Sequence, residues 1–483
     1  MFDVAIIGCG VIGAAAAYHL ARTDASVVIL EAENDVSAGT TKANSAILHA
    51  GYDPAPGTRI AALNVRGSAL AQEICAALDV PYRRTGSLVL AFGPEEDAHV
   101  QELCRRGLAN GVPGVRVLSG CEARALEPAL SPQVTSALYA PSAAIVSPWE
   151  YALAMAENAV ENGAQLRLCA PVSAIRSCGG SWRLETPRGA VEARCVINAA
   201  GVDSARVHAM AAGPGFSIHP CRGEYYLLDH SEGRTVRHVI FQCPTKNGKG
   251  VLVAPTVHGN LIVGPNAQNL DAPSTATTSE GLAFVAQMAR KSVPSLDLRA
   301  SIRNFAGVRA LSDQEDFILQ WAAPGFLDLA GMKSPGLSAA AAVGETALAM
   351  LRGQGFALKD RPRSELTLTR RRIRFAALSP KEKSDLVQKE PAYGRVICRC
   401  ETVTEGEIVA ACRGPIPPCS LDGVKRRTGA GMGRCQGGFC GPRALEILCR
   451  ERGLDPLAVT QDLEGSTILT SRTKQGGTDH GSV

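Results

Sequence analysis

The residues whose types and spacing can do chemistry lie towards the two ends of this chain. Near the start, Gly8, Gly10 and Gly13 fit the pattern G-x-G-x-x-G, in which glycine backbone can approach a pyrophosphate group. Near the end, seven of the 16 cysteines fall between residues 398 and 449. In a chain that shows no secretion signal, such a cluster predicts metal binding more readily than disulfides. The two patterns therefore predict a dinucleotide site and a metal centre.

The glycine pattern is informative because of the elements around it. It follows an apolar run at residues 3–7, opens a helix expected at 11–21, and precedes a second apolar run at 26–30 that ends at Glu31. This order is typical of a strand–turn–helix–strand unit that binds a dinucleotide. Free N–H groups at the helix start favour a diphosphate, and the acid can accept hydrogen bonds from ribose hydroxyls. Its charge disfavours a 2′-phosphate, and the absence of a second fingerprint indicates one tightly held cofactor.

Four of the late cysteines form two close pairs, Cys398 with Cys400 and Cys435 with Cys440. Thiolates at this spacing can ligate an iron–sulfur cluster or zinc, because their softness suits both. The glycines around them give a backbone that can approach cluster sulfurs and donate N–H bonds. The other cysteines of this region have no partner spacing and are expected to be packing residues: Cys412, Cys419 and Cys449.

Length and composition describe an ordinary globular protein. With 483 residues, the chain can form about three domains at roughly 150 residues each. Its 46% hydrophobic and 20% charged residues exclude wholesale disorder, and a net charge of +4 with 5% aromatics argues against nucleic-acid binding. The sequence shows no signal-peptide pattern and no apolar stretch near the ~20 residues that span a bilayer. We therefore expect a cytoplasmic protein, with peripheral membrane contact left open.

The elements that must position these residues follow from the apolar patterns. Eight basic residues between Arg361 and Lys383, where apolar periodicity is weak, indicate a linker or an arm that wraps the surface. A compact segment is expected at 394–455 and a polar, disordered tail after it. Helices are expected at about 59–78, 95–110, 148–162, 279–292 and 337–352, and strands at 87–92, 165–169, 195–198, 225–228, 251–253 and 260–263.

Several stretches, taken in order, resemble the FAD-dependent oxidoreductases of the D-amino-acid oxidase superfamily. They are the glycine fingerprint, ANSAILHAG at 43–51, VINAAG at 196–201, PCRGEYYL at 220–227, FAGVR at 305–309 and GMKSPGLS at 331–338. The chain resembles most the glycerol-3-phosphate dehydrogenase and L-2-hydroxyglutarate oxidase branches, over about residues 1–355. The resemblance implies noncovalently bound FAD.

The resemblance also implies which residues touch each part of FAD. The fingerprint glycines and the acid after the second strand would hold the ADP half, and later segments would meet the diphosphate, the adenine and the flavin ring. The implied residues are Gly8, Gly10, Gly13 and Glu31 at the ADP half; Thr41, Asn44 and Ser45 near the diphosphate and flavin; Val172 at the adenine with Ala200 and Gly201 nearby; and Lys333, Gly336 and Leu337 beside the flavin ring.

Enzymes of this family oxidise a C–H next to a hydroxyl or amine, hold the substrate anion with a cation and often use a base for the hydroxyl proton. Arg309 matches the family's G-x-R position for the anionic group, and a guanidinium fork suits carboxylate or phosphate oxygens. The structural alternative is an arginine that pairs with Asp313 or Glu315.

His49 lies in the segment that passes the flavin in this superfamily, so it is predicted to be a general base or a flavin hydrogen-bond donor, with a satisfied core histidine as the alternative. Tyr225 and Tyr226 alternate along a strand, so only one can face the site, and Tyr226 is preferred. Lys246 and Lys249 can add positive charge, or they lie in a solvated turn.

The cysteine segment resembles the bacterioferritin-associated-ferredoxin-like [2Fe–2S] domain that is appended to some flavin dehydrogenases. The standalone ferredoxin pattern closes with C-x2-C, whereas Cys435 and Cys440 form C-x4-C. Thr404 and Glu407 fit a capping box for a following helix. A [2Fe–2S] cluster held by the two cysteine pairs is expected, and a zinc knuckle is the alternative.

Together these patterns predict a dehydrogenase that oxidises a small hydroxylated anion, glycerol 3-phosphate first, and passes electrons through the cluster to a partner protein or sibling subunit. L-2-hydroxyglutarate or another 2-hydroxyacid is the second candidate, amines stay open, and an electron-relay subunit without its own substrate is the alternative of another class. The predicted fold is α/β and α+β: a Rossmann-like FAD-binding domain, an antiparallel-sheet substrate domain and a small helical cluster domain. The predicted boundaries are 1–90, 145–215 and 300–355 for FAD binding, 91–144 and 216–299 for substrate, 356–393 for the linker, 394–455 for the cluster and 456–483 for the tail.

Overall fold

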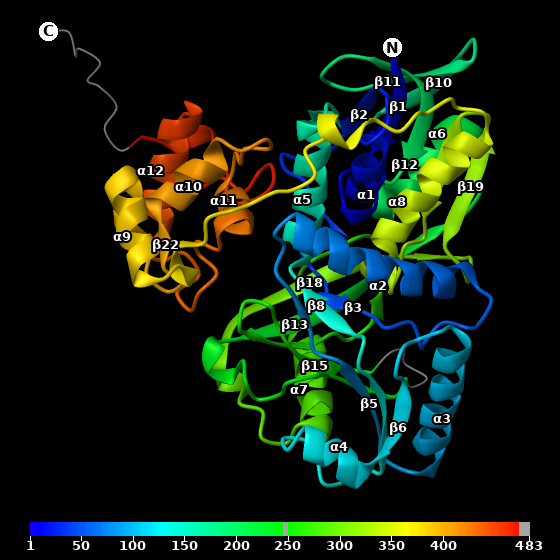
Figure 1. Cartoon of the computed structure of the whole chain (residues 1–483), viewed down its shortest axis with the longest axis vertical. Helices are drawn as coiled ribbons and strands as arrows, with labels where there is room; N and C mark the ends of the chain where they lie inside the picture. The colour runs from blue at the N-terminus through cyan, green and yellow to red at the C-terminus, as the bar shows by residue number, and fades with distance from the viewer. Residues whose placement is uncertain (245–249, 473–483) are drawn as a thin grey trace, which may run out of the picture. The chain divides into compact units, whose positions relative to one another are not determined.

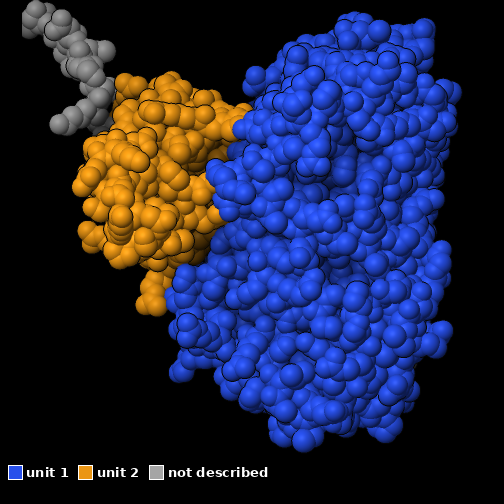
Figure 2. Space-filling model, in the orientation of Figure 1, with its two compact units in different colours: residues 1–32, 36–371 blue, residues 33–35, 372–483 orange. Residues whose placement is uncertain are grey.

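The structure is a computed structural model that describes residues 1–244 and 250–472. It divides into two compact units, which are coloured separately in Figure 2. Unit 1 contains residues 1–32 and 36–371, and unit 2 contains residues 33–35 and the chain from 372 onward. Among the described residues, none of the helices combines the length and the apolar character that crossing a bilayer requires.

The first sheet of unit 1 carries the glycine fingerprint. Its central strands β12, β1, β2 and β9 are parallel, β10 and β11 form an antiparallel edge, and β20 pairs with β12 and with β19. Helices α1, α2, α5 and α8 belong to the same part of the unit (Figure 1). Their bounds are β1 Phe2–Ile7, β2 Val27–Leu30, β9 Gln165–Arg167, β10 Ala174–Cys178, β11 Ser181–Glu185, β12 Val191–Asn198, β19 Ile318–Ala323, β20 Phe326–Ala330, α1 Val11–Leu20, α2 Arg59–Ala77, α5 Pro148–Glu161 and α8 Gly336–Gly353.

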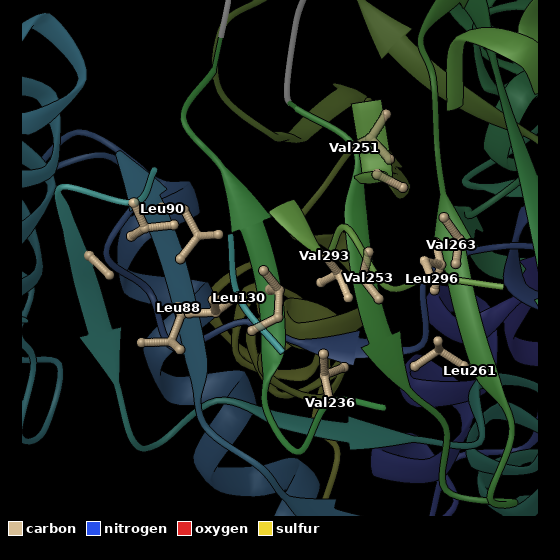
Figure 3. Packing of buried hydrophobic residues seen from close by; sticks show 14 of the residues in the cluster. Leu88, Leu90, Leu130, Val236, Val251, Val253, Leu261, Val263, Val293 and Leu296 are labelled. Atoms are coloured by element: carbon tan, nitrogen blue, oxygen red, sulfur yellow. The ribbon is translucent and has the colours of Figure 1, made fainter. Parts of the chain in front are cut away.

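The second sheet of unit 1 runs in the order β17-β13-β16-β15-β14-β5-β7-β6, with β18 also paired to β13. All its pairs are antiparallel except β14 with β5. Buried aliphatic side chains such as Leu88, Val253 and Val263 pack on it (Figure 3). The bounds are β5 Ser87–Ala91, β6 Arg116–Ser119, β7 Ser136–Ala140, β13 Ile218–Leu228, β14 Val239–Gln242, β15 Leu252–Pro255, β16 Leu261–Gly264, β17 Gln268–Asn269 and β18 Ser301–Ser312, with α3 Pro94–Ala109, α4 Gly120–Leu126 and α7 Ser279–Ser292 packed nearby.

Two strands that lie near the approximate predicted boundaries pair within the second sheet. The segment 87–90 was expected in the FAD-binding part, yet β5 lies inside the second sheet, between β14 and β7. The segment 301–312 was also expected in the FAD-binding part, yet β18 pairs with β13 along almost its whole length. Long-range pairing therefore decides which sheet each strand joins. The five expected helices are present with bounds within a residue of those predicted.

The first half of the basic segment lies on unit 1, where its arginines contact the ends of helices. Arg361 Nη1 donates to the carbonyl of Asn162, the C-cap of α5, at 2.7 Å. Arg370 and Arg371 donate through Nη1 to Leu78 O and Ala77 O, at the end of α2, at 3.3 and 3.0 Å. Because helix C-termini carry unsatisfied carbonyls and partial negative charge, these arginines stabilise the fold.

Unit 2 is a small helical unit. Its core contains Ile408, Val424 and Leu448. The predicted capping box is confirmed, since the Thr404 side chain accepts from the Glu407 amide and the Glu407 side chain accepts from Thr404 N. The elements are α9 Pro380–Lys389, β21 Val396–Cys398, β22 Val403–Thr404, α10 Glu405–Cys412, α11 Leu421–Thr428 and α12 Gly441–Arg452.

The described part of the predicted tail differs from the expectation. Val459 is 1% exposed and belongs to the core of unit 2. Thr460 forms isolated bridges with Ser420 and Thr467. Residues 456–472 are therefore part of unit 2, and the rest of the predicted tail, 473–483, lies outside the described residues.

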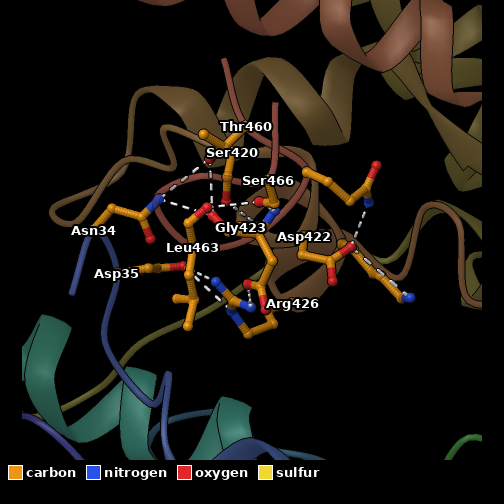
Figure 4. Close-up of polar contacts among 12 residues, drawn as sticks. Asn34, Asp35, Ser420, Asp422, Gly423, Arg426, Thr460, Leu463 and Ser466 are labelled. Atoms are coloured by element: carbon orange, nitrogen blue, oxygen red, sulfur yellow. Dashed lines mark hydrogen bonds and ion pairs between the residues drawn. The ribbon is translucent and has the colours of Figure 1, made fainter. Parts of the chain in front are cut away.

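Residues 33–35 join unit 2 although they come from the N-terminal sequence. The Asp35 carboxylate pairs with Arg427 Nη2 at 2.7 Å and with Arg426 Nη2 at 2.9 Å, and all three side chains are buried. Asn34 Nδ2 donates to the carbonyl of Asp462 at 2.8 Å (Figure 4). Burial raises the pKa of Asp35, but the charges and hydrogen bonds of Arg427 and Arg426 outweigh it and lower the pKa to about 2.

Candidate active site and cluster site

The glycine turn between β1 and α1 has the close packing that the fingerprint predicts. Gly8 has φ +95°, and a Cβ there would lie 2.6 Å from the carbonyl oxygen of Ala199 on the neighbouring strand connection. A Cβ on Gly13 would collide with the Gly8 carbonyl, and one on Gly10 would lie 3.3 Å from Thr41 Oγ1. At Gly8 and Gly13 a side chain would collide with backbone atoms, whereas at Gly10 it would press only on the Thr41 side chain. The turn therefore has the close backbone packing that the fingerprint requires.

Two amides, one in the glycine turn and one at the start of α1, donate to oxygen acceptors of the type that a nucleotide also offers. Cys9 N donates to Glu31 Oε2 at 2.6 Å, and Val11 N donates to Thr41 Oγ1 at 3.0 Å. Val172 packs in one apolar cluster with Ala200, next to strand residues of β1. These donors and this apolar patch fit the ADP half of FAD, because a helix N-terminus favours diphosphate and the acid suits ribose hydroxyls.

The two segments predicted beside the flavin are held by their own hydrogen bonds. Asn44 Nδ2 donates to Thr41 O at 2.8 Å, and its Oδ1 accepts from Ala46 N at 2.8 Å. On the other segment, Gly336 opens α8 and donates from its amide to Lys333 O at 2.7 Å. Leu337 is half-buried beside it, and Gly201 is exposed with φ +59°.

Arg309 lies on β18 directly opposite Cys221 on β13. Its Nη1 donates to Cys221 Sγ at 3.4 Å and its Nη2 donates to the carbonyl of Asn266 at 3.1 Å. Within the described residues, neither Asp313 nor Glu315 pairs with it. The guanidinium is thus oriented by two neutral acceptors, and its remaining N–H groups are available for an anion.

The preference for Tyr226 is not supported by its position. Its hydroxyl donates to Leu282 O at 3.2 Å, and its ring packs against the cluster of apolar side chains on the far side of the sheet. Tyr225 lies on the same face as Arg309, because positions an even number apart on one strand share a face. Its hydroxyl is 3.3 Å from Ser45 Oγ and its ring stacks on Phe305 at 4.8 Å. Tyr225 is therefore the tyrosine that faces the predicted site, and alternation alone could not distinguish the two.

The backbone of His49 is fixed from two sides. Its amide donates to Ser338 Oγ at 2.7 Å, and its carbonyl accepts from Ser68 Oγ at 2.7 Å and from Asn64 Nδ2 at 3.2 Å. The half-buried ring stacks on Phe241, and its Nε2 lies 3.4 Å from Ser334 Oγ, which precedes α8. The ring therefore lies where the two flavin segments meet. Lys246 and Lys249 lie outside the described residues.

The four predicted cysteine ligands form two pairs, but not the pairs that are adjacent in sequence. Cys400 Sγ lies 3.7 Å from Cys435 Sγ, and the Cys398 thiol is hydrogen-bonded to that of Cys440. Within the described residues, no three His, Cys, Asp or Glu side chains are arranged around a single metal ion. Two pairs of thiols fit a cluster of two irons that each take two thiolates better than they fit one zinc.

Backbone amides also converge on these sulfurs. The hydrogen bond from Cys440, with the amides of Gly431 and Glu401, lowers the pKa of Cys398 to about 5 despite its burial. The amide of Phe439 lowers the pKa of Cys435. These donors favour the thiolate at Cys398 and Cys435, the form that ligates a cluster, whereas the hydrogen bond with Cys398 raises the pKa of Cys440, and the pKa of Cys400 is raised as well. Cys412, by contrast, is buried in the core of unit 2 and its pKa is raised by burial to about 11, as a packing residue should be.

Comparisons with known proteins match both units. A model of the FAD dependent oxidoreductase family, DAO, matches residues 3–350, and a model of the BFD-like [2Fe-2S] binding domain matches residues 396–450. A glycerol 3-phosphate dehydrogenase of Caloramator mitchellensis is 46% identical over 98% of this chain and 99% of its own length.

Other relatives match only the larger part of the chain. A glycerol 3-phosphate oxidase of Mycoplasma genitalium is 29% identical over 72% of this chain and 94% of its own length. The solved structure of an L-alpha-glycerophosphate oxidase of Mycoplasma pneumoniae with FAD bound is similar with a TM-score of 0.71 and 29% identity, over 75% of this chain and 96% of that one.

Proposed function

The chain belongs to the family of FAD dependent oxidoreductases and carries a BFD-like [2Fe–2S] domain, and from that premise we propose that it oxidises glycerol 3-phosphate to dihydroxyacetone phosphate and passes the electrons on through the cluster. The observation that carries this proposal is the similarity to a glycerol 3-phosphate dehydrogenase along both units. The arrangement of Arg309 supports it, because a phosphate dianion needs a cation that is not already neutralised.

Arg309 binds the phosphate group in this proposal. A guanidinium has five N–H groups, and within the part of the chain that the structure describes two of its nitrogens donate, to Cys221 Sγ and Asn266 O. The others can form a two-point contact with phosphate oxygens, which fixes the substrate in orientation as well as in place.

His49 accepts the hydroxyl proton at Nε2. Stacking on Phe241 and the bonds at both ends of its peptide unit hold the ring in one orientation, so the nitrogen is presented to a substrate without further ordering. The hydroxyls of Tyr225 and Ser45 lie 3.3 Å apart, so both can donate to a substrate oxygen placed beside the pair. FAD, when bound, accepts the hydride from the carbon that carries the hydroxyl.

Cys398, Cys400, Cys435 and Cys440 would hold the [2Fe–2S] cluster, which would supply one-electron transfer to a protein acceptor. The acceptor is proposed to be another protein or a sibling subunit. The combination of a two-electron and a one-electron centre favours a dehydrogenase that exports electrons over an oxidase that reduces oxygen directly.

Anaerobic addition of glycerol 3-phosphate to the purified protein tests this function. The oxidised flavin band should bleach within one turnover, and Arg309→Ala should slow the bleaching by at least 100-fold, about 3 kcal/mol, because the phosphate loses its cation. Arg303→Ala, an exposed arginine on the same strand, is the matched control and should bleach like the wild type.

Three other outcomes separate the alternatives. Bleaching by L-2-hydroxyglutarate but not by glycerol 3-phosphate would leave the family intact and replace the substrate. Bleaching by neither, with rapid reduction by a partner protein, would favour an electron-relay subunit. Bleaching that survives Cys400→Ser with Cys435→Ser, while reduction of a protein acceptor is lost, would support the role of the cluster pair.

A further inference from the structure

Glu224, on β13, is a fully buried carboxylate that does not face the proposed substrate site. It lies on the side of the sheet opposite Arg309, since it is an odd number of positions from Cys221, which stands opposite that arginine. Its Oε1 accepts from Thr278 N at 2.5 Å and from Thr278 Oγ1 at 3.0 Å, and its Oε2 accepts from Asn266 Nδ2 at 2.5 Å. A buried charge with such complete hydrogen bonding indicates a constrained role.

Asn266 connects this carboxylate to the guanidinium. Its Nδ2 donates to the Glu224 carboxylate, and its Oδ1 accepts from Glu224 N at 2.8 Å. The Asn266 side chain therefore binds both the side chain and the backbone of Glu224. Its own carbonyl accepts from Arg309 Nη2 at 3.1 Å. The position of that carbonyl, and with it the plane of the guanidinium, therefore depends on the carboxylate behind the sheet.

The space around this chain of contacts is closed. A Cβ on Gly281, in the first turn of α7, would collide with Glu224 Oε2, and a Cβ on Gly223 would collide with Arg309 Nη2. The Glu224 carboxylate and the Arg309 guanidinium therefore occupy space that a side chain at 281 or 223 would take. Neither can rotate away and keep its hydrogen bonds.

The charges are arranged so that Arg309 stays available. Arg222 Nη2 lies 3.9 Å from Glu224 Oε1, with both side chains buried, and supplies the local countercharge for that carboxylate. Among the described residues, the polar contacts of the Arg309 guanidinium are to neutral atoms, a sulfur and a carbonyl oxygen. A carboxylate that touched Arg309 directly would neutralise it and compete with an anionic substrate.

We propose that Glu224 and Asn266 are positioning residues that orient Arg309 for the anionic group of the substrate without touching the substrate themselves. This inference rests on the proposed function, in which Arg309 binds phosphate. The residues act on binding of the anion more than on the transfer of hydride, because they do not reach the carbon that reacts.

The test measures flavin reduction and anion binding in Glu224→Gln and Asn266→Ala. A glutamine at 224 has one acceptor oxygen, so it cannot accept from both Thr278 and Asn266. An alanine at 266 removes the hydrogen bonds between the Asn266 side chain and Glu224 and leaves those between Glu224 and Thr278. Each variant should raise KM for glycerol 3-phosphate about tenfold and change kcat less than twofold. The dissociation constant of inorganic phosphate, measured by calorimetry on the FAD-loaded protein, should rise by a similar factor.

Two comparisons separate positioning from general structural damage. Glu280→Gln, an exposed carboxyl in the same first turn of α7, should leave both constants unchanged. In an Arg309→Ala background, Glu224→Gln should have no further effect on phosphate binding, because the group it orients is gone. FAD content and thermal unfolding confirm that each variant is folded, and Asn266→Ala serves if Glu224→Gln does not fold.

Additive effects in the Arg309→Ala background, or a fall in kcat with KM unchanged, would overturn the positioning role. If glycerol 3-phosphate fails to reduce the wild-type flavin, the proposed function fails, and the positioning role is then judged on phosphate binding alone. Phosphate binding that does not depend on Arg309 would overturn it.

Discussion

The two units bury arginines against different partners. In unit 2, Arg426 and Arg427 both pair with the Asp35 carboxylate and Arg426 also pairs with Asp462, so two acids of the same unit balance the two positive charges. In unit 1, Arg309 donates to a thiol sulfur and to the backbone carbonyl of Asn266. Glu224, the carboxylate proposed to fix this arrangement, binds the side chain of Asn266 and does not contact Arg309 directly. The first arrangement stabilises a fold, whereas the second keeps a positive charge ready for a ligand.

The first half of the basic segment, on unit 1, shows a third environment for arginine. Arg361 donates to carbonyls at the ends of α5 and α1, at 2.7 Å to Asn162 and 3.5 Å to Ala21. Its Nε also lies 3.9 Å from the carboxylate of Glu365. Arg361 therefore combines helix-end carbonyls with a nearby acid, whereas Arg309, the arginine proposed to bind substrate, contacts a sulfur and a carbonyl.

The largest effect is expected from removing the carboxylate in unit 2. Asp35→Ala removes the carboxylate that both buried guanidinium groups share, so Arg427 loses its ion pair with Asp35 while Arg426 keeps its pair with Asp462. The free energy of unfolding of unit 2 should fall by about 3–5 kcal/mol. Chemical denaturation followed by circular dichroism and by iron content measures this, and Asp385→Ala, an exposed acid in the same unit, is the control. Equal stability of the two variants would contradict the structural role. FAD content should stay that of the wild type.

The second prediction gives Arg309 a carboxylate partner, like the one that Arg426 and Arg427 have in unit 2. Cys221→Asp places a carboxylate within reach of Arg309 Nη1 and should lower kcat/KM for glycerol 3-phosphate about 100-fold, or about 3 kcal/mol, because the anion then competes with an internal one. Cys221→Ser keeps a neutral acceptor and should stay within about threefold of the wild type. A Cys221→Asp enzyme with unchanged KM would show that Arg309 does not bind the anionic group.

The smallest expected effect is a pH dependence that belongs to unit 2. The pKa of Asp35 falls from 3.8 to about 2 on folding, so its ionised form contributes about 2 kcal/mol of stability above pH 4. This contribution is lost as the pH falls through about 2, and roughly half remains at pH 3. The stability difference between the wild type and Asp35→Asn should therefore shrink from pH 6 to pH 3. A difference that stays constant over this range would contradict the assignment.

Features that depend on short stretches of chain could be predicted from the sequence. The glycine turn, the helix after it and the acid at the end of β2 lie within thirty-one residues, and each is determined by local backbone chemistry. The capping box at Thr404 is local in the same sense. The two cysteine pairs were also visible, although the structure joins Cys398 with Cys440 and Cys400 with Cys435.

Features that depend on pairing between distant segments could not be predicted. Whether Tyr225 or Tyr226 faces the site depends on the register of β13 against β18, about eighty residues away. Asp35 and Arg427 are 392 positions apart, and nothing near either residue indicates the pair. The basic segment could have been solvated, because a run of arginines does not reveal which helix ends lie beside it.

Because residues 33–35 belong to unit 2, truncation of this protein or transfer of its cluster domain affects both units. The cluster module is not a continuous stretch of polypeptide, because Asn34 and Asp35 contribute to it from a position just after Glu31. A chain shortened at residue 371 would keep this tripeptide but lose the residues that bind it. Fusing residues 372–472 to another oxidoreductase would also require introducing the equivalents of Asn34 and Asp35 into the recipient's N-terminal sequence.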